Sequence, residues 1–368
     1  MTIIFFWTGV TGYMAACWRA LAAAPGVRLK LYIEVRRNAS TDYHQAEVLE
    51  GLDYDLRFEG EPLDCATLRQ EVLGLKPDVL VVLGWRCKMC RFAATDRAFA
   101  AMPKLFAFDM TFAFTLRKLL ARIVLRPYLR RFAGAVVPSE RSAFYARYLG
   151  FAESQIERGL IGIDTVLFAV AREARARLHS YPRQFVFVGR YTPEKRVDVL
   201  VKAYRLYRSR VRDPWGLTCC GMGAQGALLK GQEGIRDQGF VQPKAMPDIY
   251  ARHGALVVTS DYDPWPLVIA EAVASGLPVV CTEACGSHVD FVRSYYNGRV
   301  CGTNDVEGIA DAMAWVHDRE AELAMMGARG MALTAPYSVD VWAERWMEIC
   351  KKVLACESPR TGNGSPLS

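Results

Sequence analysis

One segment, residues 257–280, limits the fold more than any other, because it predicts a strand, a turn, a helix and a second strand in close succession. Paired valines stand at both its ends, and β-branched apolar residues are typical of buried strands. Pro264 and Pro266 predict a turn ahead of a helix over 267–275, which Gly276 ends. Two strands joined through one helix run parallel, so this segment predicts a parallel α/β sheet.

Strand-like apolar runs alternate with helical patterns along the rest of the chain, which predicts helices on both faces of parallel sheets. A chain of 368 residues is long enough for two such domains, which we expect to be Rossmann-like and to face a central cleft. Their boundary is placed at 160/161, ahead of a polar connector over 169–181. Ser139 is expected to cap a helix over 139–149, and residues 357–368 to form a disordered tail. The predicted strands are 3–6, 27–35, 78–83, 103–108 and 133–138, then 185–188, 217–220, 255–258 and 278–281.

Composition narrows the class of protein. Hydrophobic residues make up 52% of the chain, but no apolar run reaches the roughly 18 residues that span a bilayer, and no signal-like segment is seen, so a cytoplasmic protein is expected. The 11 cysteines show no zinc or disulfide pattern and are expected to be reduced core thiols. Cys87 and Cys90 form the only Cys-x-x-Cys pair, and a redox role for them is the alternative.

Basic residues gather in one stretch of a chain whose net charge is +7. No nucleic-acid-binding motif accompanies the stretch, so nucleic acid is not expected as a partner. Apolar residues alternate with the charges, and Pro127 divides the stretch into two short helical pieces. Such a segment can lie on an anionic membrane surface; the alternative is a solvated charged face over a core stripe. The basic side chains of 117–131 are Arg117, Lys118, Arg122, Arg126, Arg130 and Arg131.

Two cations and two acids point to a ligand. Arg190 and Lys195 follow the strand at 185–188, and ligands of open α/β sheets bind beyond strand ends, so this pair can hold a diphosphate. The alternative is that they pair on the surface with neighbouring acids. Asp263 and Glu271 frame a helix start, where free N–H groups attract an anion. Together they favour a ligand that carries both phosphate and hydroxyl groups.

The motifs occur together in one order along the chain: Gly189-Arg190 with Glu194-Lys195, then Gly221-Met-Gly223, Gly239-Phe-Val241 and 260–280. In this combination the chain resembles the GT-B glycosyltransferases of family 4, the retaining group with an E-x7-E motif, over essentially residues 3–355. The resemblance implies two Rossmann-like domains, 1–160 and 161–336, and a final helix over 337–355 that crosses back to the first domain.

The resemblance also implies roles for single residues. Glu271 would bind the ribose of a nucleoside-diphosphate sugar, and Asp263 would bind hydroxyls of the donor sugar. Arg190 and Lys195 would hold the diphosphate with no metal or other cofactor. The other implied site residues are Leu267 and Val268, through their N–H groups, Gly9 and Gly12 in a loop of the first domain, Phe240 and Val241 near the base, and Asp109.

The chain departs from the family pattern at two places. Asp263 stands where the family has Glu, and Asp109 stands where many relatives have His. Asp109 can bind a sugar hydroxyl or orient the acceptor; a turn cap is the alternative. Asp261 and Asp263 also spell D-x-D, the metal-binding signature of the other major glycosyltransferase fold, which the two-domain pattern disfavours.

We therefore expect a metal-independent retaining glycosyltransferase that moves a sugar from a nucleoside-diphosphate sugar to a glycan or lipid-linked acceptor. It is expected to be cytoplasmic and to reach the inner face of the membrane peripherally, through 117–131. Two alternatives remain: a GT-B protein that binds nucleotide or glycan without catalysis, and a nucleotide-sugar epimerase.

Overall fold

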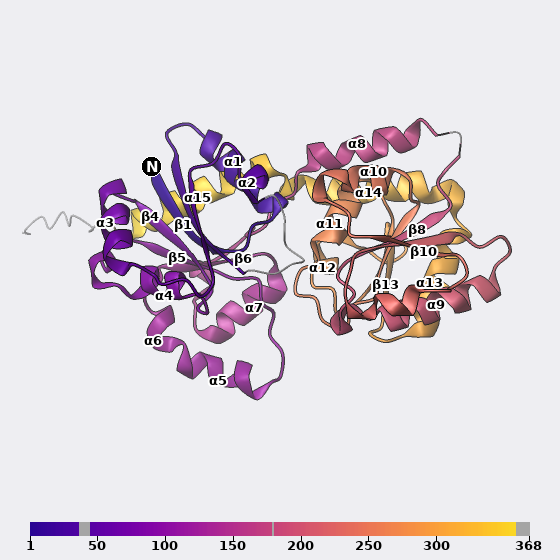
Figure 1. Cartoon of the computed structure of the whole chain (residues 1–368), viewed down its shortest axis with the longest axis horizontal. Helices are drawn as coiled ribbons and strands as arrows, with labels where there is room; N and C mark the ends of the chain where they lie inside the picture. Colours follow the sequence, from indigo (N-terminus) through magenta and orange to yellow (C-terminus); the bar gives the residue numbers. More distant parts are fainter. Residues whose placement is uncertain (37–44, 179, 358–368) are drawn as a thin grey trace, which may run out of the picture. The chain divides into compact units, whose positions relative to one another are not determined.

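The computed structural model describes residues 1–36, 45–178 and 180–357 (Figure 1). Two compact units make up the chain: Met1–Gly162 together with the C-terminal helix from Val339, and Ile163–Ser338. These limits lie two residues beyond the domain limits expected from the sequence, 160 and 336. The expected tail over 357–368 lies outside the described residues except for Glu357, which ends the last helix.

The first unit is built on a seven-stranded parallel sheet of order β3-β2-β1-β4-β5-β6-β7. The sequence pattern missed only its two edge strands, β3 and β7. Both mix charged residues with apolar ones and are only partly buried, because an edge strand is covered less completely than a central one. The strands are β1 Thr2–Thr8, β2 Arg28–Val35, β3 Tyr54–Phe58, β4 Val79–Leu83, β5 Lys104–Ala107, β6 Gly134–Val137 and β7 Ile156–Arg158.

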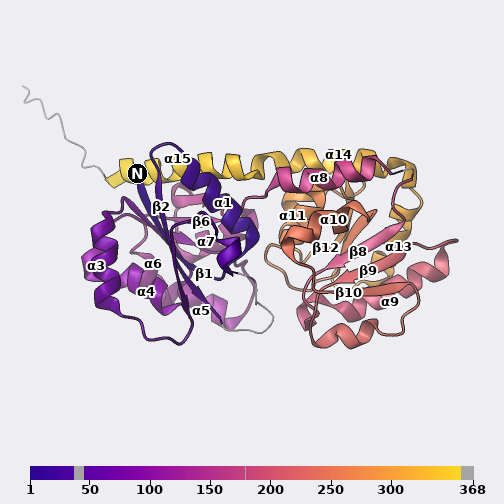
Figure 2. The same ribbon diagram turned by 45° about the horizontal axis from the view of Figure 1, so that its top comes forward.

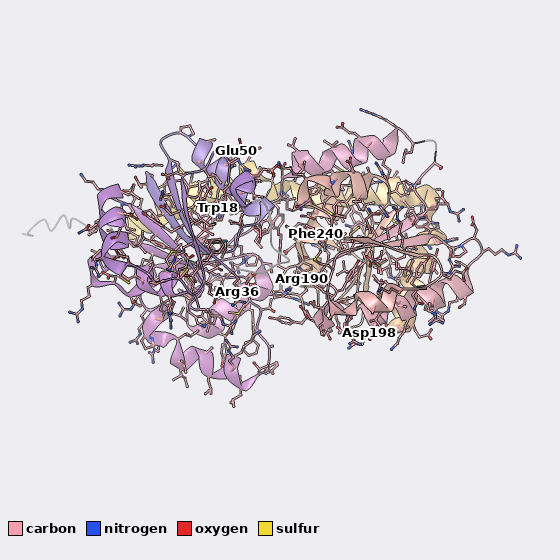
Figure 3. The ribbon with its side chains drawn as sticks, in the orientation of Figure 1. Trp18, Arg36, Glu50, Arg190, Asp198 and Phe240 are labelled. Atoms are coloured by element: carbon pink, nitrogen blue, oxygen red, sulfur yellow. The ribbon has the colours of Figure 1, made fainter. Side chains whose placement is uncertain are left out.

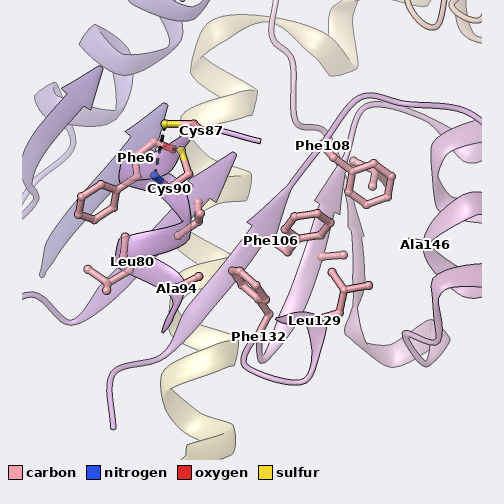
Figure 4. Packing of buried hydrophobic residues seen from close by; sticks show 14 of the residues in the cluster. Phe6, Leu80, Cys87, Cys90, Ala94, Phe106, Phe108, Leu129, Phe132 and Ala146 are labelled. Atoms are coloured by element: carbon pink, nitrogen blue, oxygen red, sulfur yellow. Dashed lines mark hydrogen bonds between the residues drawn. The ribbon is translucent and has the colours of Figure 1, made fainter. Parts of the chain in front are cut away.

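Helices cover both faces of this sheet. On one face, Phe5 of β1 packs against Trp18 of α1 and Trp346 of α15, with ring centroids 6.2 and 5.1 Å apart. On the other face, alternate β1 residues such as Phe6 join a core with α3, α4 and α7 (Figure 4). The helices are α1 Gly12–Ala23, α2 Gln45–Val48, α3 Cys65–Leu75, α4 Lys88–Thr95, α5 Leu116–Val124, α6 Arg126–Leu129, α7 Glu140–Leu149 and α15 Val339–Glu357.

Two local expectations for this unit can be compared with the structure. Ser139 does precede α7, but its side chain does not cap the helix, and Oγ has no hydrogen-bond partner among the described residues. Cys87 and Cys90 are free, buried thiols at the start of α4, where the Cys90 N–H donates to Cys87 Sγ at 3.3 Å (Figure 4). The hydrogen bond with Cys87 and burial raise the pKa of Cys90, which disfavours a reactive thiolate.

The second unit contains a six-stranded parallel sheet of order β10-β9-β8-β11-β12-β13. Again the two edge strands, β10 and β13, were not predicted; β10 is exposed or half-buried along its whole length, and β13 is half-buried at its two middle positions. The strands are β8 Gln184–Val188, β9 Gly216–Cys220, β10 Ile235–Gly239, β11 Ala255–Val258, β12 Val279–Thr282 and β13 Gly298–Cys301.

In this unit α9 and α13 cover one face of the sheet, and α8, α10, α11 and α14 lie on the other (Figures 1 and 2). The connector expected over 169–181 is wrong for most of its length, because α8 runs to Ala176. A charged residue, Arg175, occupies one of its few buried positions and hides the helical pattern. The helices are α8 Thr165–Ala176, α9 Val197–Arg210, α10 Met246–Ala251, α11 Leu267–Ala274, α12 His288–Phe291, α13 Val306–His317 and α14 Leu323–Thr334.

The fold class expected from the sequence is confirmed: two parallel, Rossmann-like α/β sheets, with the C-terminal helix α15 packed against α1. Within residues 1–36, 45–178 and 180–357, no helix combines the length and the apolar character that crossing a bilayer requires.

Helix α5 exposes most of its apolar side chains. Only Ala121 is buried, whereas Leu116, Ile123 and Val124 are 73%, 71% and 69% exposed. The alternative of a charged face over a core stripe is therefore wrong for this helix, because the apolar residues themselves face outward. Five exposed arginines of the same stretch form no ion pair with any described carboxylate: Arg117, Arg122, Arg126, Arg130 and Arg131.

Candidate functional site

Three loops meet at the carboxyl edge of the second sheet, where β8, β9 and β10 end. The Gly189 N–H donates to Cys220 O at 3.0 Å, and the Gly221 N–H donates to Gly239 O at 2.8 Å. A Cβ on Gly221 would lie 1.9 Å from Gly189 O, so the chains can approach this closely only because position 221 is glycine. The glycines of the motif thus fix the backbone from which Arg190 leaves.

The loop after β8 is held against the loop after β11. Thr259 is fully buried, and its hydroxyl donates to the carbonyls of Lys195 and Arg196 at 3.0 and 3.1 Å. The Asp261 N–H donates to Glu194 O at 3.0 Å. These bonds fix the backbone of Lys195 beside the turn that contains Asp263.

Lys195 and Asp263 form an ion pair, Nζ to Oδ2, in which the side chains are only 17% and 11% exposed. The surface pairing with neighbouring acids considered for Lys195 is therefore wrong. For Arg190 that alternative is borne out in part, since its guanidinium lies 3.4 Å from Glu194 while remaining 74% exposed. The two cations thus differ: Lys195 is held in place, and Arg190 is free to move toward a ligand.

The turn that carries Asp263 is tightly anchored to the loop after β12. The Gly286 N–H donates to Asp263 O at 2.8 Å, and a Cβ on Gly286 would lie 1.8 Å from Pro264 O. The buried Trp265 donates from Nε1 to Asp290 at 3.1 Å. The turn is therefore fixed before any ligand arrives, which favours preorganised binding.

The two acids of the D-x-D sequence bind different cations. Asp261 lies 3.5 Å from the Arg196 guanidinium, and Asp263 pairs with Lys195. Among the described residues no group of three or more His, Cys, Asp and Glu side chains is placed to hold a metal ion.

Helix α11 begins directly after the anchored turn. The Ile269 N–H donates to Pro266 O at 3.2 Å, and the N–H groups of Leu267 and Val268, which come before it, have no acceptor within the helix. Glu271 lies one turn after Leu267 on the same helix face. The free N–H groups and Glu271 therefore lie on the first turns of α11, and this helix starts at the carboxyl edge of the sheet.

Glu271 is desolvated and partnered by a residue that the sequence analysis missed. Burial raises the pKa of its carboxyl to about 7, and the hydrogen bond from Tyr250 acts in the opposite direction. Tyr250 is fully buried and donates from its hydroxyl to Glu271 Oε2 at 3.0 Å. No local motif marks Tyr250, because it lies 21 residues away in another helix.

Phe240 and Val241 follow β10, at the same edge of the sheet, and Phe240 is 40% exposed. Phe240 and Arg190, both labelled in Figure 3, come from this one end of the second unit. The other three predicted residues belong to the first unit. Gly9 has φ of +78° and donates to Glu34 O at 2.9 Å; Gly12 begins α1; and Asp109 follows β5.

The structure thus groups the predicted residues by unit. Eight of them lie at or near the carboxyl edge of the second sheet: Arg190, Lys195, Phe240, Val241, Asp263, Leu267, Val268 and Glu271. Gly9 and Asp109 follow strands of the first sheet, also at its carboxyl edge, with Gly12 in the first turn of the adjoining helix. In both units these positions are the ones where open parallel sheets bind ligands.

Sequence comparisons match most of the second unit to a known family. Residues 172–332 match the family of glycosyl transferases group 1. The chain is 31% identical to the glycogen synthase of Mycobacterium tuberculosis over 179 residues, which cover 47% of this chain and 42% of that protein. It is 29% identical to the O-antigen chain mannosyltransferase B of Escherichia coli over 161 residues, 42% of each chain. Among all the curated relatives that match, this chain spans between a fifth and a half of the relative's length.

Structural comparison extends over almost the whole chain. The Anabaena protein HepE, solved in complex with UDP and glucose, is 16% identical, and the match covers 96% of this chain and 100% of that one with a TM-score of 0.73. At this identity the likeness establishes the two-unit architecture. Residues 172–332 therefore match the group 1 glycosyl transferases, and the chain as a whole has the GT-B fold.

Proposed function

We propose that the chain is a retaining, metal-independent glycosyltransferase. It moves a sugar from a nucleoside-diphosphate sugar to the hydroxyl of a glycan or lipid-linked acceptor in polysaccharide or lipid-linked glycan synthesis. The observation that carries this proposal is the anchored Lys195–Asp263 pair beside the start of α11, within the unit that matches the family. An ammonium, a carboxylate and free helix N–H groups there suit a diphosphate and a sugar on one ligand.

The chemistry proposed for the site is charge stabilisation on the leaving group. Arg190 and Lys195 bind the diphosphate and stabilise the negative charge that grows as the glycosidic bond breaks. Lys195 already points at Asp263, so a bound donor changes this pair: the phosphate shares the ammonium, and Asp263 accepts hydrogen bonds from the sugar. The N–H groups of Leu267 and Val268 complete the contacts with the donor.

The remaining proposed contacts are those with the ribose and the base of the nucleotide. Glu271 accepts hydrogen bonds from the ribose, and Phe240 with Val241 lies near the base. Ligands bound to two structural relatives support uridine as the first base to test: HepE was solved with UDP and glucose, and the pneumococcal O-GlcNAc transferase with UDP and GlcNAc. From the first unit, Gly9 and Gly12 would provide a loop over the diphosphate, and Asp109 would bind a sugar hydroxyl or orient the acceptor.

A thermal-shift screen with UDP, GDP, ADP and their sugars tests this proposal. A nucleoside diphosphate at 100 times its Kd stabilises the native protein by about 2.7 kcal/mol, so one base is expected to raise the Tm clearly above the others. The Glu271→Ala variant is expected to lose that shift. The absence of any shift in the wild type, or an equal shift in the variant, would contradict the assignment of the site.

Two alternative functions are separated by the products. A protein that binds nucleotide without catalysis leaves the stabilising nucleotide sugar intact, whereas a transferase hydrolyses it slowly to free sugar and nucleoside diphosphate when no acceptor is present. An epimerase releases a different sugar. The first alternative is motivated by Asp263, which is shorter than the family's Glu, and by Asp109, which stands where many relatives have His. Asp263 is in addition paired with Lys195.

We also propose that the protein binds an anionic membrane surface through residues 117–131, where it would meet its acceptor. Exposed apolar side chains of α5 stand among arginines that pair with no described carboxylate, and this combination inserts into a headgroup region while binding acidic lipids. A lipid-linked acceptor would then be reached from the cytoplasmic side.

Sedimentation with lipid vesicles tests whether residues 117–131 bind a membrane. The wild type is expected to bind phosphatidylglycerol vesicles and to dissociate at high salt, because the arginine attraction is screened. The double variant Leu116→Gln/Ile123→Gln should lose most of this binding. The matched control Val166→Gln/Val170→Gln, on the exposed face of α8, should keep it. Equal sedimentation of the two double variants would disprove the α5 surface.

A further inference from the structure

One buried cation connects the two helices that carry Tyr250 and Glu271. Arg175 of α8 is 5% exposed, and its guanidinium donates to three main-chain carbonyls. Nη2 donates to Tyr250 O at 2.7 Å, near the end of α10, while Nη1 donates to Ser275 O at 3.0 Å and Gly276 O at 3.2 Å, at the end of α11. A single planar group therefore binds both helix C-termini.

The physical basis of this contact is the polarity of a helix end. The last carbonyls of a helix lack intrahelical donors and carry partial negative charge, so a guanidinium placed there satisfies them and neutralises the charge. Because the guanidinium donates in fixed directions, it also sets the separation of the two helix ends. Phe168, on the same helix as Arg175, packs against the Tyr250 ring with centroids 6.0 Å apart.

The Tyr250 side chain completes the connection to the site. Its hydroxyl reaches Glu271 Oε2 across the space between α10 and α11, while its own carbonyl is bound by Arg175. Glu271 Oε1 makes no hydrogen bond to any other described residue and is left for a ligand. Tyr250 therefore orients one carboxylate oxygen and leaves the second one accessible.

We propose that Tyr250 and Arg175 are positioning residues that aim the Glu271 carboxylate at the ribose of the donor. Tyr250 acts directly, through Oε2, and Arg175 acts by holding the carboxyl ends of α10 and α11 at the spacing that this hydrogen bond needs. The inference rests on the proposed function, since it needs Glu271 to bind the two ribose hydroxyls.

Ribose selectivity is the measurement that separates positioning from plain stability. Calorimetry gives the Kd of UDP and of 2′,3′-dideoxyuridine diphosphate, or of the matching GDP or ADP pair if the wild type binds that base more tightly. The wild type is expected to prefer the ribonucleotide about tenfold or more, the value of a hydrogen bond to a charged group. In Tyr250→Phe this ratio should fall toward one.

The matched control is Tyr207→Phe. Tyr207 is also fully buried, on the opposite face of the sheet. Its hydroxyl forms a hydrogen bond with His317 Nδ1 at 2.8 Å and accepts one from the main-chain N–H of Trp215 at 2.8 Å. Its loss should lower the Tm and leave the ribose ratio at the wild-type value. An unchanged ratio in Tyr250→Phe, or equal losses in the two variants, would overturn the role of Tyr250.

The Arg175 half of the proposal has its own test. Arg175→Lys keeps the positive charge but not the planar guanidinium that binds both helix ends, so it should retain part of the preference for the ribonucleotide. Arg175→Met removes the charge as well and should lose most of that preference. A lower Tm with an intact ratio in Arg175→Met would assign Arg175 to stability alone. A wild type that binds both nucleotides equally refutes the ribose role of Glu271 itself, and failure of every nucleoside diphosphate to bind refutes the proposed function; either result also overturns this inference.

Discussion

Turnover of the nucleotide sugar is expected to fall more than tenfold in both Arg190→Ala and Lys195→Ala, but only Lys195→Ala should also destabilise the fold. Each variant removes a charge that would stabilise the leaving diphosphate. Arg190 is largely exposed and pairs loosely with Glu194, and surface pairs of this kind contribute about 0–1 kcal/mol. Lys195 neutralises a nearly buried carboxylate, and leaving Asp263 unpaired costs about 1–3 kcal/mol.

The double variant Lys195→Ala/Asp263→Asn separates the two effects, because it removes the uncompensated charge without restoring the cation. It should recover stability and remain inactive. Arg210→Ala is the matched control: Arg210 ends α9, remote from the carboxyl edge of the sheet, and pairs with Glu307 and Asp311. Steady-state rates and Tm values are measured for the wild type and for all four variants. Near-wild-type turnover in both Arg190→Ala and Lys195→Ala would refute the diphosphate assignment.

The sequence predicted the central strands of both sheets and failed at all four edges. Central strands of a parallel sheet are covered on both faces and are nearly continuous apolar runs, as in β4 and β11. Edge strands such as β3 and β7 keep polar and charged residues at partly exposed positions. These strands form because they pair with a neighbouring strand, and the local sequence pattern does not predict that pairing.

The site shows the same division between local and long-range information. Gly189, Gly221 and the turn at 264–266 are required by backbone geometry, so their spacing along the chain predicted where the loops would meet. The partner of Lys195 was not predictable, because other acids lie nearer to it in the sequence. Lys195 pairs with Asp263 because the loops after β8 and β11 pack together. Tyr250 and Arg175 were missed for a related reason, since their partners lie in other helices.

The second large effect is expected in Glu271→Gln, which should lose nucleoside diphosphate binding and yet be more stable than the wild type at alkaline pH. Burial raises the pKa of Glu271 from 4.5 to about 7, so between these values the native protein binds more protons than the unfolded chain. Stability of the wild type therefore falls as pH rises from about 4.5 to 7, by roughly 3 kcal/mol in total. Glutamine does not titrate and avoids this loss.

Thermal unfolding without ligand at pH 5 and pH 8 measures the difference. The Tm of Glu271→Gln relative to the wild type should rise between the two values, while the thermal shift given by the nucleoside diphosphate disappears. Glu194→Gln is the control, since a hydrogen bond from its own backbone N–H lowers the pKa of Glu194. A lowered pKa makes the native protein bind fewer protons than the unfolded chain, so the Tm difference of this control should not rise between pH 5 and pH 8. A constant difference for Glu271→Gln would mean that Glu271 ionises at its ordinary pKa in the folded protein, and that its desolvation by the surrounding helices does not shape the site.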